Sequence, residues 1–210
     1  MFHDTMKIIG LTGGSGAGKG EVSLCFMSQG IRALDTDKVS RLVCAPGQPC
    51  LKELEEQFGS EIIREDGTLD RHKLADLVFG DPDDATRSAR LSALNHITHS
   101  HIIAEINSWL EGRAKAGDTL AVIDAPQLFE SGFDKHCDYI IGVIAEHEVR
   151  VRRISSRDGI SHDAAEKRIA AQKSDEFFIE HCDFIVHNDG GLAELEGQVN
   201  NILHKINYVR

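Results

Sequence analysis

The sequence predicts an α/β fold in which helices alternate with the strands of a parallel sheet. Short apolar runs recur along the chain with helical segments between them, which is typical of such folds. The run at residues 119–124 is apolar at nearly every position, as interior parallel strands are. Hydrophobic residues make up 41% of the 210 residues, enough for a sizeable core and too many for a disordered chain.

Five strands and several helices are predicted in order. The strands are expected at residues 7–12, 31–35, 119–124, 139–145 and 184–187. After the first strand, apolar residues recur at helical spacing until Gly30, a natural helix stop. The interval from about residue 38 to 115 contains no convincing strand and is expected to be helical, at residues 49–58, 71–79 and 86 to about 113. We therefore expect a mainly helical insertion on one side of the sheet.

The glycine-rich segment that follows the first strand is the clearest functional signal. Residues 13–20 read Gly-Gly-Ser-Gly-Ala-Gly-Lys-Gly and match Gly-x-x-x-x-Gly-Lys, the P-loop pattern. The glycines let the backbone curl so that its N–H groups point at phosphate oxygens. Lys19 is expected to reach the terminal phosphates, and the next helix offers its positive end. A flexible linker, the alternative, would not lie between a buried strand and a helix.

One position departs from the P-loop pattern. Gly20, which Glu21 follows, stands where Ser or Thr normally supplies a hydroxyl to Mg²⁺. The P-loop of adenylate kinases also has Lys-Gly here. Mg²⁺ keeps several waters and is held largely by substrate phosphates, so metal use is compatible with Gly20. No residue is identified as a direct metal ligand, and Asp124 is a candidate for holding the ion through water.

Acidic residues end two of the predicted strands. Asp35 ends the second strand, with Asp37 two residues later, and Asp124 ends the third. Open α/β sheets bind ligands at this edge, where a carboxylate orients an acceptor hydroxyl, takes its proton or holds water on magnesium. The alternative is structural: Asp35 as a helix N-cap and Asp37 in the first helical turn. Periodicity alone does not separate the two interpretations.

A basic segment covers residues 149–172, against the acidic trend of the chain. Its cations are Arg150, Arg152, Arg153, Arg157, Lys167 and Arg168. A solvated helix paired with Glu146, Glu148 and Glu166 is one interpretation. The other is a phosphate lid, a helix–turn–helix that closes over the P-loop and expels water.

Charge and cysteine content exclude other classes of protein. Lys and Arg number 23 against 34 acidic residues, a net charge of −11, which argues against a nucleic-acid-binding protein. The five cysteines are odd in number and unpaired in spacing, as in a reduced cytosolic protein. No apolar run is long enough for a membrane span, and the first residues do not resemble an export signal. We expect a cytoplasmic protein that binds neither membrane nor nucleic acid.

The motifs together resemble the dephospho-coenzyme A kinase family over nearly the whole chain. The shared features are Ile-Gly-Leu-Thr-Gly-Gly-x-Gly-x-Gly-Lys at residues 9–19, Asp35-Thr-Asp37 followed by Arg41, Phe58-Gly59, Asp66-Gly-Thr-Leu-Asp-Arg71 with Phe79, Pro126-Gln-Leu-Phe-Glu130, Arg157-Asp158, Arg168-Ile-Ala-Ala-Gln172 and Asp183-Phe-Ile-Val-His-Asn188. Each motif is weak alone, but their order and spacing make a specific signal.

The resemblance implies a three-layer α/β/α P-loop kinase fold with a five-stranded parallel sheet. It implies one domain, with its core at about residues 7–37, 117–149 and 174–210. A helical acceptor-binding insertion is expected at about 38–116 and a helical lid at about 150–173. The implied reaction is ATP-dependent phosphorylation of the ribose 3′-hydroxyl of dephospho-coenzyme A, with Mg²⁺ accompanying ATP. A monomer or a weak homo-oligomer is expected.

Site residues carry over position by position. Asp37 matches the aspartate that activates the acceptor hydroxyl, and it forms the catalytic set with Lys19 and Arg157, a lid arginine. The expected ATP-binding residues are Gly14, Ser15, Gly16, Ala17, Gly18, Lys19, Gly20, Glu21, Arg157 and Asn188, the last bordering the adenine. The expected acceptor-binding residues are Asp37, Arg41, Arg71 and Phe79. Core packing is the preferred role of Phe79, and for Arg71 packing and acceptor contact weigh equally.

Three departures from the family pattern leave alternatives open. Gly20 replaces Ser or Thr, Ser100 follows His99 where the family has proline, and Gln127 replaces a leucine. One alternative is another P-loop small-molecule or nucleoside monophosphate kinase, which leaves residues 66–71 unexplained. Another is a non-catalytic nucleotide-binding homologue whose magnesium site has decayed. A nucleic-acid regulator is disfavoured by the acidity of the chain.

Overall fold

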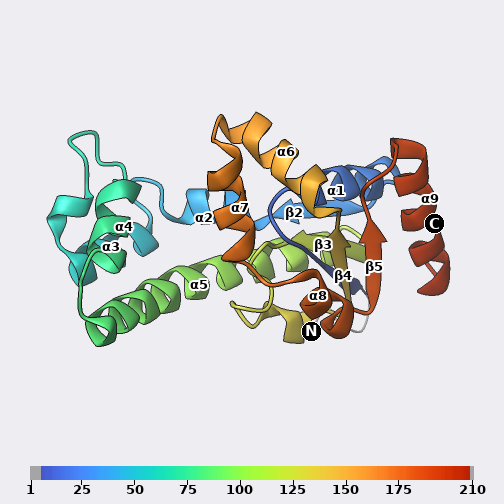
Figure 1. The fold of residues 1–210 in the computed structure, drawn as a ribbon. Helices are drawn as coiled ribbons and strands as arrows, with labels where there is room; N and C mark the ends of the chain where they lie inside the picture. The colour runs from blue at the N-terminus through green and yellow to red at the C-terminus, as the bar shows by residue number, and fades with distance from the viewer. Residues whose placement is uncertain (1–5, 209–210) are drawn as a thin grey trace. The chain divides into compact units, whose positions relative to one another are not determined.

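The computed structural model describes residues 6–208, which form two compact units. Unit 1 comprises the described residues up to 35 together with residues 112–208, and unit 2 comprises residues 36–111. Unit 1 contains the sheet, and unit 2 is helical (Figure 1). The boundaries of unit 2 lie close to the segment expected to bind the acceptor, and that assignment stays a prediction.

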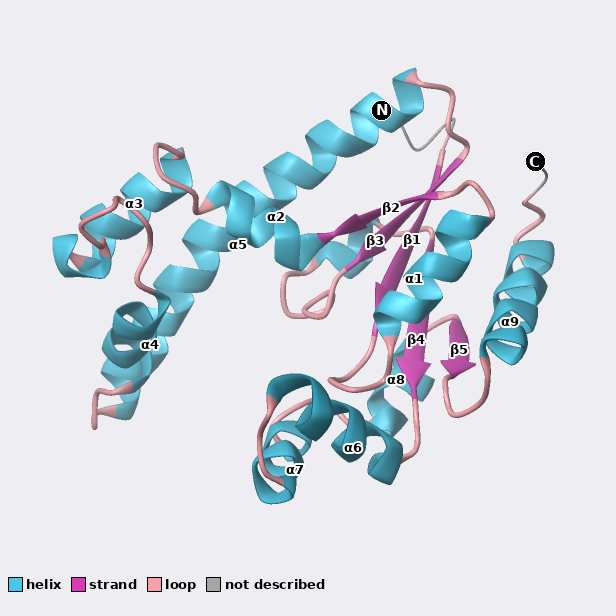
Figure 2. Cartoon of the chain, turned by 90° about the horizontal axis from the view of Figure 1, so that it is seen from above, coloured by secondary structure: helices cyan, strands magenta, loops and turns pink. Residues whose placement is uncertain are grey.

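Unit 1 is built on five parallel strands. They are β1 (Lys7–Thr12), β2 (Arg32–Asp35), β3 (Leu120–Asp124), β4 (Tyr139–Ile144) and β5 (Phe184–His187), in the spatial order β2-β3-β1-β4-β5 (Figure 2). In the central strand, Ile9 pairs with Val122 of β3 and Tyr139 of β4. All five strands predicted from sequence are confirmed within one residue of their ends.

Helices cover both faces of the sheet, so unit 1 has three layers. On one face, α1 (Lys19–Ser28) and α9 (Leu192–Lys205) pack on apolar residues of β1, β3 and β4, including Leu11, Val122 and Val143. The other face carries α8 (Asp175–His181), whose Phe178 lies over Gly142. The predicted α/β/α P-loop kinase fold, with its parallel sheet, is confirmed.

A helical hairpin is inserted in the sequence between β4 and β5. It consists of α6 (His147–Asp158) and α7 (His162–Ala170), which lie beyond the carboxyl ends of β1 and β4 (Figure 2). Its own apolar contacts, made by Val151, Ile154, Ala165 and Ile169, hold the two helices together. The helix–turn–helix predicted at residues 149–172 is therefore present.

Unit 2 contains α2 (Thr36–Val43), α3 (Pro49–Phe58), α4 (Arg71–Phe79) and most of α5 (Asp84–Lys115). There are also two short 3₁₀-helices, η2 (Ser60–Ile62) in unit 2 and η3 (Phe133–His136) in unit 1. The helices predicted in this interval are confirmed. Asp70 caps α4, because its Oδ1 accepts from the backbone N–H groups of His72 and Lys73, both at 3.1 Å.

Among residues 6–208, no helix has both the length and the apolar character that a membrane span requires.

Candidate active site

The loop at residues 13–18 joins β1 to α1 at the carboxyl edge of the sheet, and all six of its carbonyl groups accept hydrogen bonds. Two accept from backbone N–H groups, Gly14 from Ala17 at 3.2 Å and Gly18 from Glu21 at 3.0 Å. The others accept from side chains: Gly13 from Lys19 Nζ (2.9 Å), Ser15 from Arg150 Nε (3.0 Å), Gly16 from Arg153 Nη1 (3.3 Å) and Ala17 from Asn188 Nδ2 (2.9 Å).

Three amides in this loop and at the start of α1 show the opposite pattern. The N–H groups of Gly16, Gly18 and Gly20 donate to no group in the described part of the chain. These donors precede or begin α1, whose N-terminal end carries partial positive charge. Backbone N–H groups in this arrangement bind phosphate oxygens. The loop therefore offers unused N–H donors to an anionic ligand, while each of its carbonyl groups already accepts a hydrogen bond from the protein.

Close packing under the loop explains two of its glycines. Gly16 has a φ of 77°, and a Cβ there would lie only 2.7 Å from the carbonyl oxygen of Arg150. A Cβ on Gly14 would overlap the guanidinium Nη2 of the same arginine. Larger residues at either position would push the loop away from α6.

Lys19, the first residue of α1, crosses the loop to reach its beginning. Its ammonium group donates to the Gly13 carbonyl at 2.9 Å. The lysine thus closes the loop on itself and places a positive charge beside the amides. This position supports its predicted role as the cation that meets the terminal phosphates.

The predicted acidic residues lie along the same edge or directly after it. Asp35 and Asp124 are register partners at the ends of β2 and β3. Asp37 is exposed in the first turn of α2, two residues beyond β2. The first-turn position expected on the structural interpretation is therefore correct, and the residue is exposed there.

Of the six cations in the basic segment, two reach the loop. Arg150 and Arg153, both on α6, bind loop carbonyls, whereas the guanidinium of Arg157 binds Asp158 at 2.7 and 2.9 Å. These bonds, together with Arg168, lower the pKa of Asp158 to about 2. Arg157 is the predicted lid arginine, and its contact with ATP stays a prediction.

Arg150 was not singled out from the sequence as a site residue. It lies on the buried face of α6 with Val151 and Ile154, and it is only 4% exposed. The sequence did hold a signal for this: Arg150 lies one helical turn before Ile154, so helical spacing places it on the apolar face of α6 that packs against the protein. Gln172, which binds both the N–H and the hydroxyl of Ser15, was likewise seen only as part of a motif.

Asn188 follows β5 and is 4% exposed. Its Nδ2 donates to the Ala17 carbonyl at 2.9 Å and to Glu21 Oε2 at 2.7 Å. The side chain therefore fixes the loop and the start of α1. Its expected contact with adenine stays a prediction.

The predicted acceptor residues in unit 2 are Arg41, at the end of α2, and Arg71 and Phe79, at the two ends of α4; all are exposed. Core packing of Phe79 is wrong, because its side chain is 55% exposed. Leu74 and Val78, one helical turn apart, occupy the buried face of α4, and Phe79 lies about 100° further round the helix. An exposed aromatic residue is compatible with acceptor binding, which stays a prediction.

The environments of the cysteines disfavour a nucleophilic role for three of them. All five cysteines are free, and Cys25, Cys44 and Cys50 are buried. Burial raises the pKa of Cys50, Cys137 and Cys182 to about 12. A thiol with so high a pKa is protonated at neutral pH and is a poor nucleophile.

Gly20 gives a first prediction, because a Cβ at this position would meet nothing within 4 Å. Gly20→Ala and Gly20→Ser are both expected to fold and to raise the free energy of unfolding by about 0.5 kcal/mol, since each reduces the freedom of the unfolded chain. Only the serine adds a hydroxyl. We expect Gly20→Ser to reach half-maximal turnover at a lower Mg²⁺ concentration than Gly20→Ala, measured by titrating the metal at fixed ATP. Identical metal dependence of the two variants would show that other groups already position the ion.

Comparison with known proteins agrees with this geometry. The family model described as dephospho-CoA kinase matches residues 7–194. A dephospho-CoA kinase from Corynebacterium glutamicum is 36% identical over 201 residues, which cover 96% of this chain and 100% of the relative. A crystal structure of a protein from Thermus thermophilus has a TM-score of 0.79 at 30% identity, covering 96% of this chain and 98% of that one.

A second solved structure, a dephospho-CoA kinase from Campylobacter jejuni, shares the fold, with a TM-score of 0.67 at 22% identity and coverage of 95% and 96% of the two chains. The family match extends from β1 to the start of α9 and includes the loop, the acidic edge and the helical hairpin. The family match over residues 7–194 and the 36% identical relative, covered over its whole length, show that this chain is a kinase of the dephospho-CoA kinase family.

Proposed function

We propose that this protein transfers the γ-phosphoryl group of ATP to the ribose 3′-hydroxyl of dephospho-coenzyme A, giving coenzyme A and ADP in the last step of coenzyme A synthesis. The observation that carries the donor half is the loop at residues 13–18: its carbonyls all accept bonds from the protein, while the N–H groups of Gly16 and Gly18 donate to no group of the described chain. The family match, which extends over residues 7–194, supports the choice of acceptor.

On the donor side, phosphoryl transfer needs positioning and charge stabilisation more than covalent chemistry. The amides of Gly16, Gly18 and Gly20 hold the phosphate oxygens, and the ammonium of Lys19 meets the charge that develops during transfer. Their arrangement in advance of binding lowers the cost of reorganisation.

On the acceptor side, Asp37 takes the proton of the attacking 3′-hydroxyl. Support comes from its exposure and from its place two residues after β2, whose end borders the ligand-binding edge of the sheet. Arg41, Arg71 and Phe79 bind other parts of the acceptor. Arg157 neutralises charge near the transferring phosphoryl when the hairpin closes and excludes water.

The donor set at the sheet edge fits magnesium. Mg²⁺ prefers oxygen ligands and retains waters, and the Asp35 and Asp124 carboxylates end neighbouring strands. We propose that these carboxylates hold the ion through water, in place of the hydroxyl absent at Gly20. When bound with ATP, the ion neutralises charge on the β- and γ-phosphate oxygens.

The direct test is incubation of the purified protein with ATP, Mg²⁺ and dephospho-coenzyme A, with ADP and coenzyme A measured by chromatography. Formation of both products in equal amounts is expected. AMP, UMP and shikimate serve as competing acceptors. Turnover of one of these without turnover of dephospho-coenzyme A would contradict the proposal. ATP binding without transfer under any divalent cation would favour the non-catalytic alternative.

Two finer proposals concern the setting of the enzyme. We propose that it works in the reducing cytoplasm, and its five free cysteines support this proposal. We also propose that it acts as a monomer or a weak homo-oligomer, which light scattering over a range of concentrations tests.

A further inference from the structure

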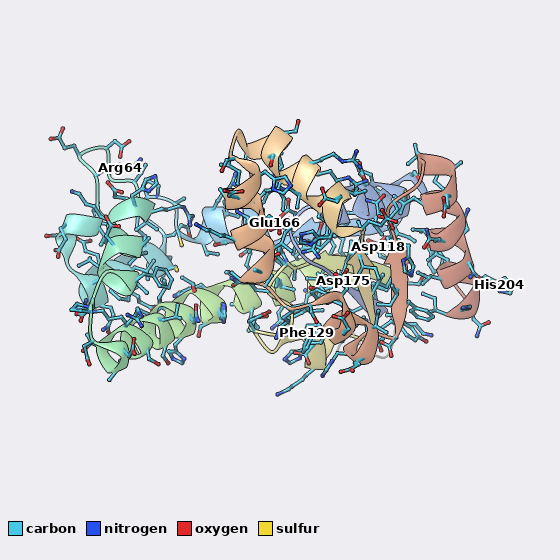
Figure 3. All side chains as sticks on the ribbon, in the orientation of Figure 1. Arg64, Asp118, Phe129, Glu166, Asp175 and His204 are labelled. Atoms are coloured by element: carbon cyan, nitrogen blue, oxygen red, sulfur yellow. The ribbon has the colours of Figure 1, made fainter. Side chains whose placement is uncertain are left out.

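Arg150 is buried beneath the phosphate-binding loop although it carries a charged group. Its Nε donates to the Ser15 carbonyl at 3.0 Å, and its Nη1 donates to Oδ1 of Asp175 at 3.0 Å. Asp175 lies at the start of α8 and is labelled in Figure 3. The buried Nη2 has no hydrogen-bond partner within residues 6–208. Burial of a charge is costly unless it is fully paired, so an arginine that is incompletely paired calls for a role beyond packing.

The geometry of the peptide bond gives that role. A trans peptide unit is planar, and its C=O and N–H groups point in opposite directions. The Ser15 carbonyl and the Gly16 N–H belong to one such unit. By holding this carbonyl on the α6 side, Arg150 turns the Gly16 N–H to the opposite side, where it donates to no group of the described chain.

Asn188 orients a second peptide unit, two residues further along the loop. Its Nδ2 holds the Ala17 carbonyl at 2.9 Å, and the N–H of that peptide unit belongs to Gly18. The Gly18 N–H is again one of the amides that are available. Two alternate peptide units are therefore oriented from outside the loop by buried side chains of α6 and of the segment after β5.

Gln172 fixes the same peptide region from its other end. Its Oε1 accepts from the Ser15 N–H at 2.8 Å, and its Nε2 donates to Ser15 Oγ at 2.9 Å. With the bond from Arg150, every polar group of Ser15 is held by residues of the helical hairpin or its end. The orientation of the Ser15–Gly16 peptide therefore depends on Arg150 and Gln172 together.

We propose that Arg150 is a positioning residue for the donor phosphates, acting through the Ser15–Gly16 peptide and assisted by Gln172. This inference rests on the proposed function, since it assigns the role to the ATP side of that site. Arg150 need not touch the nucleotide: it sets the direction of an amide that does.

The test uses Arg150→Met, which keeps a long apolar stem and removes every donor. We expect the KM for ATP to rise about tenfold or more, the loss that follows removal of a hydrogen bond to a charged group. The dissociation constant for inorganic triphosphate, measured by calorimetry, should rise by a similar factor. The KM for dephospho-coenzyme A should stay within about twofold of wild type, because the acceptor does not bind this loop.

Three further variants separate positioning from stability. Arg150→Lys should restore part of the triphosphate affinity, since an ammonium group replaces one of the two contacts. Gln172→Ala should weaken triphosphate binding, and its effect should be less than additive with Arg150→Met because both act on one peptide. Arg113→Met is the matched control: Arg113 is a half-buried arginine paired to Asp118 at 3.8 Å, before the amino end of β3, and its loss should leave the KM for ATP unchanged.

Unchanged triphosphate affinity in a folded Arg150→Met protein would overturn the inference, as would equal increases in the KM of both substrates. Should Arg150→Met not fold, Arg150→Lys and Gln172→Ala carry the test by the same measurements. Wild-type turnover is measured alongside, so failure of this inference is distinct from failure of the proposed kinase activity.

Discussion

Lys19→Ala is expected to reduce kcat/KM for ATP by at least about 10²–10³-fold, the loss typical when one charge-stabilising donor is removed from a transition state. The ammonium group lies 2.9 Å from the Gly13 carbonyl, so it is held where the terminal phosphates of a nucleotide on the loop would meet it. Initial rates at varied ATP, with dephospho-coenzyme A saturating, measure the effect.

Two controls accompany this variant. Lys19→Arg keeps the charge but replaces a compact ammonium group with a planar fork, so only partial recovery is expected. Lys7→Ala is the control: it removes a lysine at the start of β1, at the amino edge of the sheet, and should leave kcat/KM for ATP unchanged. A loss of less than about tenfold for Lys19→Ala would mean that the loop amides alone provide the stabilisation.

Asp37→Asn is expected to lower kcat by about 10²–10⁴-fold, the usual contribution of a general base. Asparagine has nearly the same shape and cannot accept the proton of the 3′-hydroxyl. ATP binding should be unaffected, because no loop carbonyl depends on Asp37 for its hydrogen bond. Turnover and ATP affinity measured on the same preparation separate the chemical step from binding.

Glu56→Gln is a suitable control for Asp37→Asn. It also replaces a carboxylate by an amide on an exposed helix of unit 2, and it removes only a surface ion pair to Lys52. Its kcat should match wild type. Wild-type kcat in Asp37→Asn would exclude proton transfer to this residue. Asp35 and Asp124 would then be the candidates for the general base.

The sequence predicted local structure well because the elements of this fold are encoded locally. The apolar run at β3 and the helical spacing from Lys19 to Gly30 each reflect the burial of one face of a single segment. The order β2-β3-β1-β4-β5 depends instead on contacts between residues far apart in sequence. No local pattern carries those contacts; the family resemblance predicted a five-stranded parallel sheet, and the order of its strands was not predicted.

The phosphate-binding loop was predicted from sequence, but most of its supports were not. A P-loop pattern specifies glycines and a lysine, whereas the groups that hold the Ser15 and Ala17 carbonyls come from residues more than 130 positions away. Arg150 was noticed only as one charge among several. The error at Phe79 has a similar origin: hydrophobic character alone does not say on which side of α4 a residue at its end lies.

The attachment of α6 to the loop has a consequence for motion. Arg150 and Gln172 stand near the two ends of the hairpin, and both are bonded to Ser15. Arg153 of α6 is bonded to Gly16 as well, so a swing of the hairpin over a nucleotide that keeps all of these bonds must pivot between Arg153 and Gln172. The travelling part is then the outer length of α6 and α7, which includes Arg157 and Arg168, while the roots of both helices stay anchored.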